Sequence, residues 1–316
     1  MASIGVKVIR GLFGAAERIA PQIGGRAAFE LFCRTPNPRR LSEGERRAID
    51  RAAGFMEEAR HHRITVGRHC VIVHEFRPRG GRDNAGSVLV LHGWRSRTEY
   101  MKSLIEAYRD AGYRVMSLDL PGHGGSTGRR LNLASAVSAA HVAGEWFGPF
   151  AAVIGHSFGG SVAVNAIAGS ITGVPPLAAS KLVLIAAPSS MPDLFRDFGR
   201  YLNLGPRTQS AMADQVRSIA GRPLDEFVGS RQLAETPVPT LVIHAPDDRE
   251  VPAGHAELFA QAGDHVRLHW APGLGHRRIL SDPAVVGDAL GFVARQPVSA
   301  QIGQLAHRAG HLRLHS

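Results

Sequence analysis

The sequence predicts an α/β protein with a mostly parallel, doubly wound sheet. Short apolar runs alternate with helical segments, and continuous apolar runs are typical of parallel strands buried on both faces. The runs lie at residues 88–92, 113–120, 151–156, 182–186, 240–244 and 266–270. An antiparallel strand pair at 63–66 and 69–76 precedes them, and strand–helix repeats after such a pair build a doubly wound sheet. In sheets of this kind the reactive groups gather at the carboxyl ends of the strands.

We expect three parts in the chain. Residues 63–295 form the α/β domain, residues 1–62 form a helical extension before it, and residues 296–316 form a basic tail. About fifty residues separate the strands at 182–186 and 240–244, which is too many for an ordinary connection. We therefore expect a short helical cap over about 188–238. The remaining connections predict helices near 98–111, 132–146, 158–170, 253–262 and 282–294.

The extension should contain two helices. Residues 42–58 begin with the capping-box pattern Ser42-Glu43-Gly44-Glu45. Residues 3–20 place five apolar side chains on one face of a helix: Ile4, Val8, Leu12, Ala15 and Ile19. Such helices can pack on the main domain, pair with another subunit or lie on a membrane surface. Packing on the domain is the default expectation.

Composition excludes several classes of protein. The 316 residues are 44% hydrophobic and 20% charged, which is typical of a soluble globular chain. No run approaches the roughly 18 apolar residues that a membrane-spanning helix needs. Charged residues interrupt the N-terminal segment, which is therefore a poor secretory signal. Cys33 and Cys70 are too few for a disulfide framework or a zinc site, so we expect reduced thiols and a cytoplasmic protein.

The net charge of +10 lies in the flanks of the chain. Residues 1–85 carry 16 basic against 9 acidic residues, residues 295–316 carry three arginines and no acid, and the middle is balanced. A weak contact between the basic N-terminal helix and anionic lipid is one interpretation. Solvated helix faces in an arginine-rich protein are the default one. No aromatic or glycine-rich RNA-binding signature accompanies the charge, so we expect no nucleic-acid partner.

Two windows match Gly-x-Ser-x-Gly, centred on Ser126 and Ser157. A nucleophile needs a buried strand that runs straight into a tight turn and then a helix, so that its hydroxyl stands clear of the sheet. Ser157 has this context, whereas Ser126 follows Pro121-Gly122 in a loop. Ser157 is therefore the candidate nucleophile, and Ser126 is interpreted as part of a loop.

A serine hydroxyl needs a base to take its proton, and an acid that orients the base should precede it in the chain. Asp247 and Asp248 follow the strand at 240–244, and His276 follows the strand at 266–270. The order and the positions at strand ends fit a Ser…Asp…His triad. His276 is the candidate base, with one of the two aspartates behind it.

Five motifs in this order resemble the α/β-hydrolase superfamily, nearest to its carboxylesterase, monoglyceride-lipase-like and serine aminopeptidase-like branch. They are Leu-His92-Gly93-Trp94, Asp119-Leu-Pro-Gly-His-Gly-Gly-Ser126, Gly155-His-Ser-Phe-Gly-Gly160, Asp248-Arg-Glu-Val-Pro252 and Gly273-Leu-Gly-His276. The resemblance covers roughly residues 63–295. It selects Asp248 over Asp247, although Ala245 stands where the family usually has glycine. Together with the need for two oxyanion donors, it assigns the backbone N–H groups of Trp94 and Phe158 to the oxyanion hole.

The resemblance implies hydrolysis of an ester, thioester or amide through an acyl-enzyme, with a small acyl compound as substrate. The apolar residues of the cap either line an acyl pocket or pack the cap on the domain: Met191, Leu194, Phe195, Phe198, Tyr201, Leu202, Leu204 and Met212. Two alternatives stay open, an acyltransferase of the same fold and a non-catalytic ligand receptor or scaffold. The sequence contains no nucleotide-binding motif, so no cofactor is expected. His307, His311 and His315 lack a further ligand and are interpreted as solvated, so no metal is expected.

Overall fold

The computed structural model describes residues 4–36, 41–79 and 85–295. The predicted basic tail, with His307, His311 and His315, lies outside these ranges. Within them no helix combines the length and the apolar character needed to cross a membrane.

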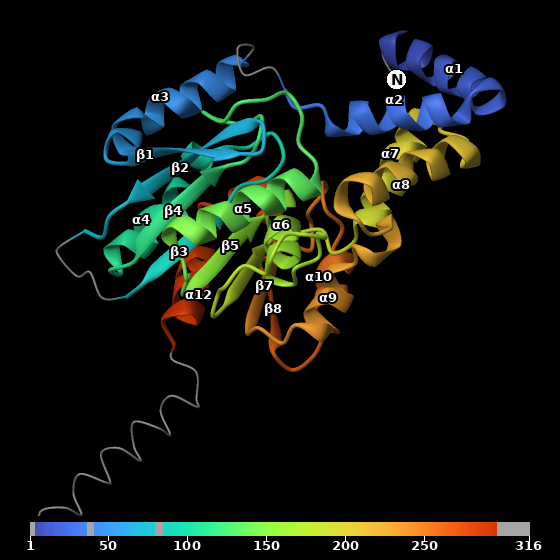
Figure 1. Cartoon of the computed structure of the whole chain (residues 1–316). Coiled ribbons are helices and arrows are strands. Elements are labelled where there is room, and N and C mark those ends of the chain that lie inside the picture. The colour runs from blue at the N-terminus through green and yellow to red at the C-terminus, as the bar shows by residue number, and fades with distance from the viewer. Residues whose placement is uncertain (1–3, 37–40, 80–84, 296–316) are drawn as a thin grey trace, which may run out of the picture.

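An eight-stranded sheet forms the centre of the molecule, in the order β1-β2-β4-β3-β5-β6-β7-β8 (Figure 1). The strands are β1 (Arg60–Val66), β2 (His69–Phe76), β3 (Ser87–Leu91), β4 (Arg114–Asp119), β5 (Ala152–His156), β6 (Leu182–Ile185), β7 (Thr240–His244) and β8 (Val266–Trp270). β2 pairs antiparallel with β1 and with β4, and every other pairing is parallel. The predicted doubly wound fold is therefore confirmed.

Helices cover both faces of this sheet. Along β3 the side chains alternate: Leu89 and Leu91 join one buried cluster and Val88 and Val90 the other. The first cluster includes residues of α5 (Leu133–Phe147), α6 (Phe158–Ile167), α9 (Gly229–Glu235) and α10 (Gly254–Ala260). The second includes residues of α3 (Glu43–Glu57), η1 (Thr98–Met101), α4 (Lys102–Asp110) and α12 (Pro283–Ala294). Burial on both faces explains why the inner parallel strands β3, β5, β6 and β7 are nearly continuous apolar runs, whereas the edge strand β8 contains the exposed Arg267 and His269.

The segment between β6 and β7 is helical, as expected for a cap. It contains α7 (Met191–Leu202), α8 (Pro206–Ala220), the short η2 (Leu224–Glu226) and α9. The helices α1 (Ile4–Ile19) and α2 (Pro21–Cys33) form a hairpin that lies beside α7 and α8, at a distance from the sheet (Figure 1). The N-terminal hairpin thus packs on the cap, while α3 packs on the sheet.

The sequence analysis did not predict α2. Gly24 and Gly25 lower helix propensity, but both are buried against α8. A Cβ atom added to Gly25 would lie 2.5 Å from the Cβ of Ala211, so the two helices can approach this closely only because Gly25 has no side chain. The glycines that weaken the helical pattern therefore serve tertiary packing.

Two charged side chains of α1 bind the ends of the cap helices. The guanidinium of Arg10 donates to the carbonyl of Tyr201 at the end of α7, at 2.6 and 2.9 Å. The carboxylate of Glu17 accepts from the backbone N–H groups of Arg207 and Thr208 in the first turn of α8, at 3.0 and 2.8 Å. A cation at a helix C-terminus and an anion at an N-terminus both stabilise the helix dipoles.

The boundary at residue 62 between the extension and the α/β domain stays a prediction. In the structure β1 begins at Arg60, inside the predicted extension. The first residues of this strand are polar, and we did not predict them as strand. His62 instead contacts Glu75 on the neighbouring strand at 2.7 Å, between Nε2 and Oε2. A cross-strand polar pair of this kind does not produce an apolar run. The Ser42–Glu45 capping box, by contrast, is present at the start of α3.

Candidate active site

Ser157 occupies the turn that joins β5 to α6. Its backbone φ is 52°, a left-handed conformation that is costly for a residue with a side chain. The turn is tight: a Cβ atom on Gly155 would lie 2.5 Å from the carbonyl oxygen of Gly159. This is the strand–turn–helix geometry that exposes a nucleophile at the top of a sheet.

The structure brings Ser157, His276 and Asp248 into contact. His276 lies in α11 (Gly275–Arg278), after β8, and Asp248 lies in the loop after β7. Nε2 of His276 is 3.0 Å from Oγ of Ser157, and Nδ1 is 2.7 Å from Oδ2 of Asp248. Both distances are within hydrogen-bonding range. The imidazole therefore links the hydroxyl and the carboxylate.

Asp248 is held in its ionised form. Burial alone would raise its pKa, but hydrogen bonds from His276 and from the N–H groups of Val251 and Glu250 outweigh burial and lower the pKa. Asp247, the alternative acid, accepts instead from the N–H of Gly273 at 2.7 Å. That contact fixes the loop that leads to His276.

His156 positions the histidine loop. Its ring nitrogen Nε2 lies 2.9 Å from the carbonyl oxygen of His276, and the two rings lie 4.9 Å apart. Burial, with the nearby ring of His276, lowers the pKa of His156 to about 3. The ring is therefore neutral at physiological pH and its Nε2–H donates to the carbonyl.

Trp94 and Phe158, the predicted oxyanion donors, both line the cavity beside Ser157. Phe158 is the first residue of α6, and Trp94 follows β3. Their aromatic rings meet edge to face at 5.7 Å. Among the described residues neither backbone N–H donates a hydrogen bond. The loop of Trp94 lies close to the serine, since a Cβ atom on Gly93 would be 2.8 Å from the Cβ of Ser157.

A buried polar network supports this loop. His92 is fully buried, with Nδ1 2.8 Å from the carbonyl of Gly93 and Nε2 accepting from the N–H of Leu120 at 3.0 Å. Asp119 accepts from the N–H groups of Thr98 and Gly125. These contacts join the loops after β3 and β4.

Ser126, the second Gly-x-Ser-x-Gly serine, is part of the same support. Its hydroxyl donates to the carbonyl of Asp119 at 2.6 Å and accepts from the N–H of Ile72 at 2.8 Å. The side chain therefore connects a loop to β2.

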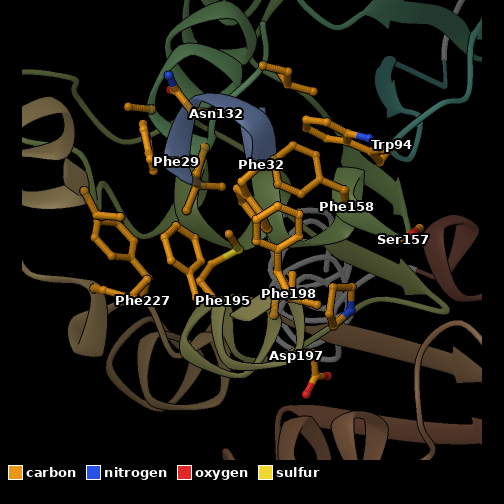
Figure 2. Close-up of a pocket in the computed structure, with 18 of the residues that line it drawn as sticks. Phe29, Phe32, Trp94, Asn132, Ser157, Phe158, Phe195, Asp197, Phe198 and Phe227 are labelled. Carbon is orange, nitrogen blue, oxygen red and sulfur yellow. The ribbon is translucent and has the colours of Figure 1, made fainter. Parts of the chain in front are cut away.

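A largely apolar cavity of about 510 Å³ opens beside Ser157. Figure 2 shows Ser157 at one side, Phe227 at the other, and a group of aromatic rings between them. Five of the eight apolar cap residues singled out from the sequence line it, namely Met191, Leu194, Phe195, Phe198 and Tyr201. Leu202 and Met212 are buried in the core, and Leu204 packs against it.

The sequence analysis missed the contribution of α2 to this cavity. Phe32 lies with its ring centroid 4.6 Å from that of Phe195 and 5.2 Å from that of Phe198, and Phe29 lines the same space (Figure 2). It also missed Glu250, whose Oε2 is 3.9 Å from Nε2 of His276. The apolar face of α2 was the available signal, but α2 ends at Cys33 and its partner helix α8 begins only at Pro206.

The model of the alpha/beta hydrolase family matches residues 88–289. The chain therefore belongs to the α/β hydrolase family. The matched segment contains every predicted site residue and the cap, but not the helices α1–α3.

Relatives include ester-cleaving enzymes. The chain is 28% identical over 240 residues to a pimeloyl-acyl-carrier-protein methyl ester esterase of Nitrosomonas europaea, which spans 63% of this chain and 92% of that protein. It is 29% identical over 201 residues to phospholipase YtpA of Bacillus subtilis, across 52% of this chain and 76% of that protein. The names of these relatives support ester hydrolysis in general.

Solved structures share the fold. Est1E of Butyrivibrio proteoclasticus, solved with bound ferulic acid, superposes with a TM-score of 0.56 at 15% identity, over 78% of this chain and 99% of that one. The proline iminopeptidase of Mycobacterium smegmatis has a TM-score of 0.54 at 19% identity, over 74% and 99%. At these identities the likeness shows the fold alone.

Proposed function

We propose that the protein is a serine esterase that hydrolyses carboxylic esters of apolar acids through an acyl-enzyme. The observation that carries this proposal is the continuous contact from Asp248 through His276 to Ser157, at 2.7 and 3.0 Å. Relatives named as a methyl ester esterase and a phospholipase support an ester as the bond that is cleaved.

In the first half of the reaction Ser157 forms the acyl-enzyme. Oγ attacks the ester carbonyl while Nε2 of His276 takes its proton, and Asp248 orients the ring and stabilises the imidazolium. The tetrahedral oxyanion is held by the N–H groups of Trp94 and Phe158. The C–O bond to the alcohol then breaks, and His276 returns the proton to the leaving oxygen.

In the second half water replaces the alcohol. His276 takes a proton from water, the hydroxide attacks the acyl-enzyme carbonyl, and the carboxylic acid leaves as Ser157 is protonated again. The apolar cavity holds the acyl chain throughout. Its volume of about 510 Å³ and its aromatic walls fit a medium-chain or aromatic acid.

Active-site labelling tests the proposal directly. A fluorophosphonate probe should label the folded wild-type protein, and Ser157→Ala should abolish labelling together with octanoyl ester hydrolysis. Ser126→Ala serves as the matched control, because it alters the other Gly-x-Ser-x-Gly window, and its folded fraction should still label. Absence of labelling in folded wild type, or unchanged labelling in Ser157→Ala, contradicts the proposal.

The cytoplasmic location expected from the sequence is part of the same proposal. Cys33 and Cys70 are both free thiols. Fractionation of cells that express the tagged full-length protein tests the location, and recovery from an extracytoplasmic fraction would exclude it.

A further inference from the structure

Ser157 lies where two cavities meet. Besides the apolar cavity of about 510 Å³, a second cavity of about 480 Å³ reaches the same serine. The two share only four lining residues: Trp94, Ser157, Glu250 and His276. Groups on either side of an ester can therefore occupy separate spaces while its carbonyl sits at Ser157.

The walls of the second cavity carry a larger share of polar groups than those of the first. They come from the start of α3, the loop after β3 with the adjoining η1, and α11. Beyond the shared residues, the lining comprises Ser42, Gly44, Glu45, Ala48, Arg95, Ser96, Tyr100, His156, Arg277 and Leu280. Because α3 precedes the segment matched by the family, one wall of this cavity is particular to the N-terminal extension.

Two carboxylates and two guanidinium groups line this cavity, and one guanidinium makes no direct polar contact with another described residue. Glu45 is engaged by Ser42, whose N–H and hydroxyl both donate to Oε2 at 2.7 Å. Arg277 donates through Nε to Glu250 at 3.0 Å. The exposed guanidinium of Arg95 has no hydrogen-bond or ion-pair partner in the described part of the chain. An anionic group that enters the cavity would supply a hydrogen-bonded ion-pair partner for Arg95.

We propose that the second cavity binds the alcohol part of the substrate, and that this alcohol is polar and carries a phosphate. This inference rests on the proposed esterase function. The substrate class is then a single-chain ester, with an apolar acid toward α2 and α7 and a phosphate-bearing alcohol toward Arg95. When the C–O bond breaks, His276 protonates the alcohol oxygen and the free alcohol leaves through the second cavity.

Three octanoyl esters with different alcohols test this arrangement. The alcohols are glycerol 3-phosphate, glycerol and propanol, and the readout is kcat/KM for octanoate release. We expect the phosphate ester to exceed the glycerol ester by about fivefold to tenfold, the gain from one charged contact at a partly exposed site. Arg95→Gln should reduce this ratio toward one. Arg249→Gln, which removes an equal charge from the neighbouring loop outside both cavities, should keep the ratio.

The outcomes separate this proposal from the esterase proposal. Hydrolysis of all three esters without a phosphate preference, or a preference that survives Arg95→Gln, overturns the assignment of the second cavity alone. Hydrolysis of none, with no fluorophosphonate labelling, overturns the esterase proposal. A lysophospholipid presented in vesicles is then compared with the soluble octanoyl glycerol 3-phosphate ester. The natural substrate class, a lipid headgroup or a soluble phosphate ester, is the one whose kcat/KM falls more in Arg95→Gln.

A second inference concerns α1 and stands on a different observation. The apolar face predicted from the sequence points to solvent: Val8 is 58% exposed, Leu12 67% and Ile19 85%, and Ile23 at the start of α2 is 68% exposed. The opposite face carries Arg10 and Glu17, which bind the ends of α7 and α8. These contacts fix the rotation of α1, so that the apolar stripe Val8, Leu12, Ile19 and Ile23 faces outward.

The exposed charged side chains near this stripe that form no ion pair among the described residues are positive, because the exposed Glu30 of α2 pairs with Arg130. Lys7, Arg18 and Arg26 are exposed, whereas Glu17 is occupied with α8. Two copies of the stripe facing each other would bring these cations together, which disfavours a homodimer. An anionic lipid surface satisfies both the cations and the apolar side chains. We propose that the stripe docks on an anionic membrane surface.

Vesicle sedimentation of the full chain tests the docking. The wild type should pellet with phosphatidylglycerol-containing vesicles and less with pure phosphatidylcholine, and pelleting should weaken as salt is added. The double variant Leu12→Glu/Ile19→Glu should lower the partition coefficient by at least about tenfold, because burial of each large apolar side chain contributes strongly. Leu258→Glu, at an apolar residue 40% exposed on α10, is the matched control and should pellet like wild type.

Three results would overturn the docking. The first is that the wild type does not pellet, and the second is that the double variant pellets as well as the wild type. The third is that the wild type binds no vesicles but forms a dimer in sedimentation velocity, whereas the double variant is monomeric. The last result would identify the stripe as an interface between copies of this chain.

Discussion

The strand-end loops and the N-terminal hairpin both line the cavity beside Ser157, but different contacts hold them in place. Ser157 and Asp248 follow the buried parallel strands β5 and β7, and His276 follows the edge strand β8, so the sheet itself sets their spacing. Phe29 and Phe32 sit on α2, which depends on close packing against α8. The candidate catalytic residues thus lie within the segment that the family model matches, whereas part of the cavity wall lies on helices outside that segment.

The largest loss of activity should come from a change to Asp248, the acid in the loop after β7. Asp248→Asn keeps the shape of the side chain but favours the wrong tautomer of His276, and should reduce kcat by about 10⁴-fold. Asp247→Asn, its neighbour and the alternative acid, is the control and should cost far less. Steady-state hydrolysis of an octanoyl ester measures both. Equal losses in the two variants would remove the assignment of Asp248.

The buried carboxylate of Asp119 tests how firmly the strand-end loops are held. Burial would raise its pKa, but hydrogen bonds from His74 and Gly125 lower the pKa well below its ordinary value. Asp119→Asn should therefore lower the free energy of unfolding at pH 7 by about 3 kcal/mol, as expected for one partner of a buried charged network.

The same change should alter the pH dependence of stability. A depressed pKa stabilises the fold above the unfolded value of about 4 and loses that contribution as the pH falls through the folded value. Urea unfolding at decreasing pH should thus show wild type approaching Asp119→Asn in acid. A constant difference between the two across this range would exclude ionised Asp119 as the cause.

The packing of the hairpin can be loosened at one residue. Gly25→Val inserts a branched side chain where a Cβ atom would already lie 2.5 Å from Ala211, and should destabilise the α2–α8 contact by about 1–3 kcal/mol. Gly11→Ala is the control, because no atom lies within 4 Å of its added Cβ. Thermal unfolding compares the two.

Cys33, at the end of α2, reports on the same contact. Burial raises the pKa of its thiol to about 12, so it should resist iodoacetamide in a Cys70→Ser background. Gly25→Val should accelerate its alkylation, whereas Gly11→Ala should not. Rapid alkylation without either change would mean that α2 is not closely packed.

The smallest effect should come from the aromatic wall itself. Phe32→Ala removes the ring that contacts Phe195 and Phe198, and should reduce kcat/KM for an octanoyl ester by about tenfold relative to an acetyl ester. Trp146→Ala removes an exposed ring outside the cavity and should leave the ratio unchanged. An unchanged octanoyl-to-acetyl ratio in Phe32→Ala would separate the N-terminal hairpin from substrate binding.

Local sequence patterns predicted the sheet and the residues at its strand ends. An apolar run followed by Gly-x-Ser-x-Gly specifies a strand, a turn and a helix within a few residues, so Ser157 could be singled out without tertiary information. An aspartate before His276 followed from the same logic, and the resemblance to the α/β-hydrolase superfamily selected Asp248 over Asp247. Their catalytic roles stay predictions that the experiments above address.

The N-terminal hairpin could not be predicted in this way. Gly24 and Gly25 read as helix breakers in isolation, and their value appears only against Ala211 and Thr208 of α8. Arg95 and Glu45 come from separate segments and share a cavity only after α3 has packed on the sheet. Tertiary contacts of this kind leave no local periodicity.

The presence of two cavities at one serine has a consequence for the fate of the proposed acyl-enzyme. Once the first product has diffused away, the acid remains anchored while the other compartment stands open to any incoming nucleophile. Water yields a free acid, whereas an alcohol that fits between Arg95 and Tyr100 would receive the acyl group instead. The balance between hydrolysis and acyl transfer would then depend on how tightly the second cavity binds the incoming alcohol. The residues of α3 that line this cavity would set that affinity.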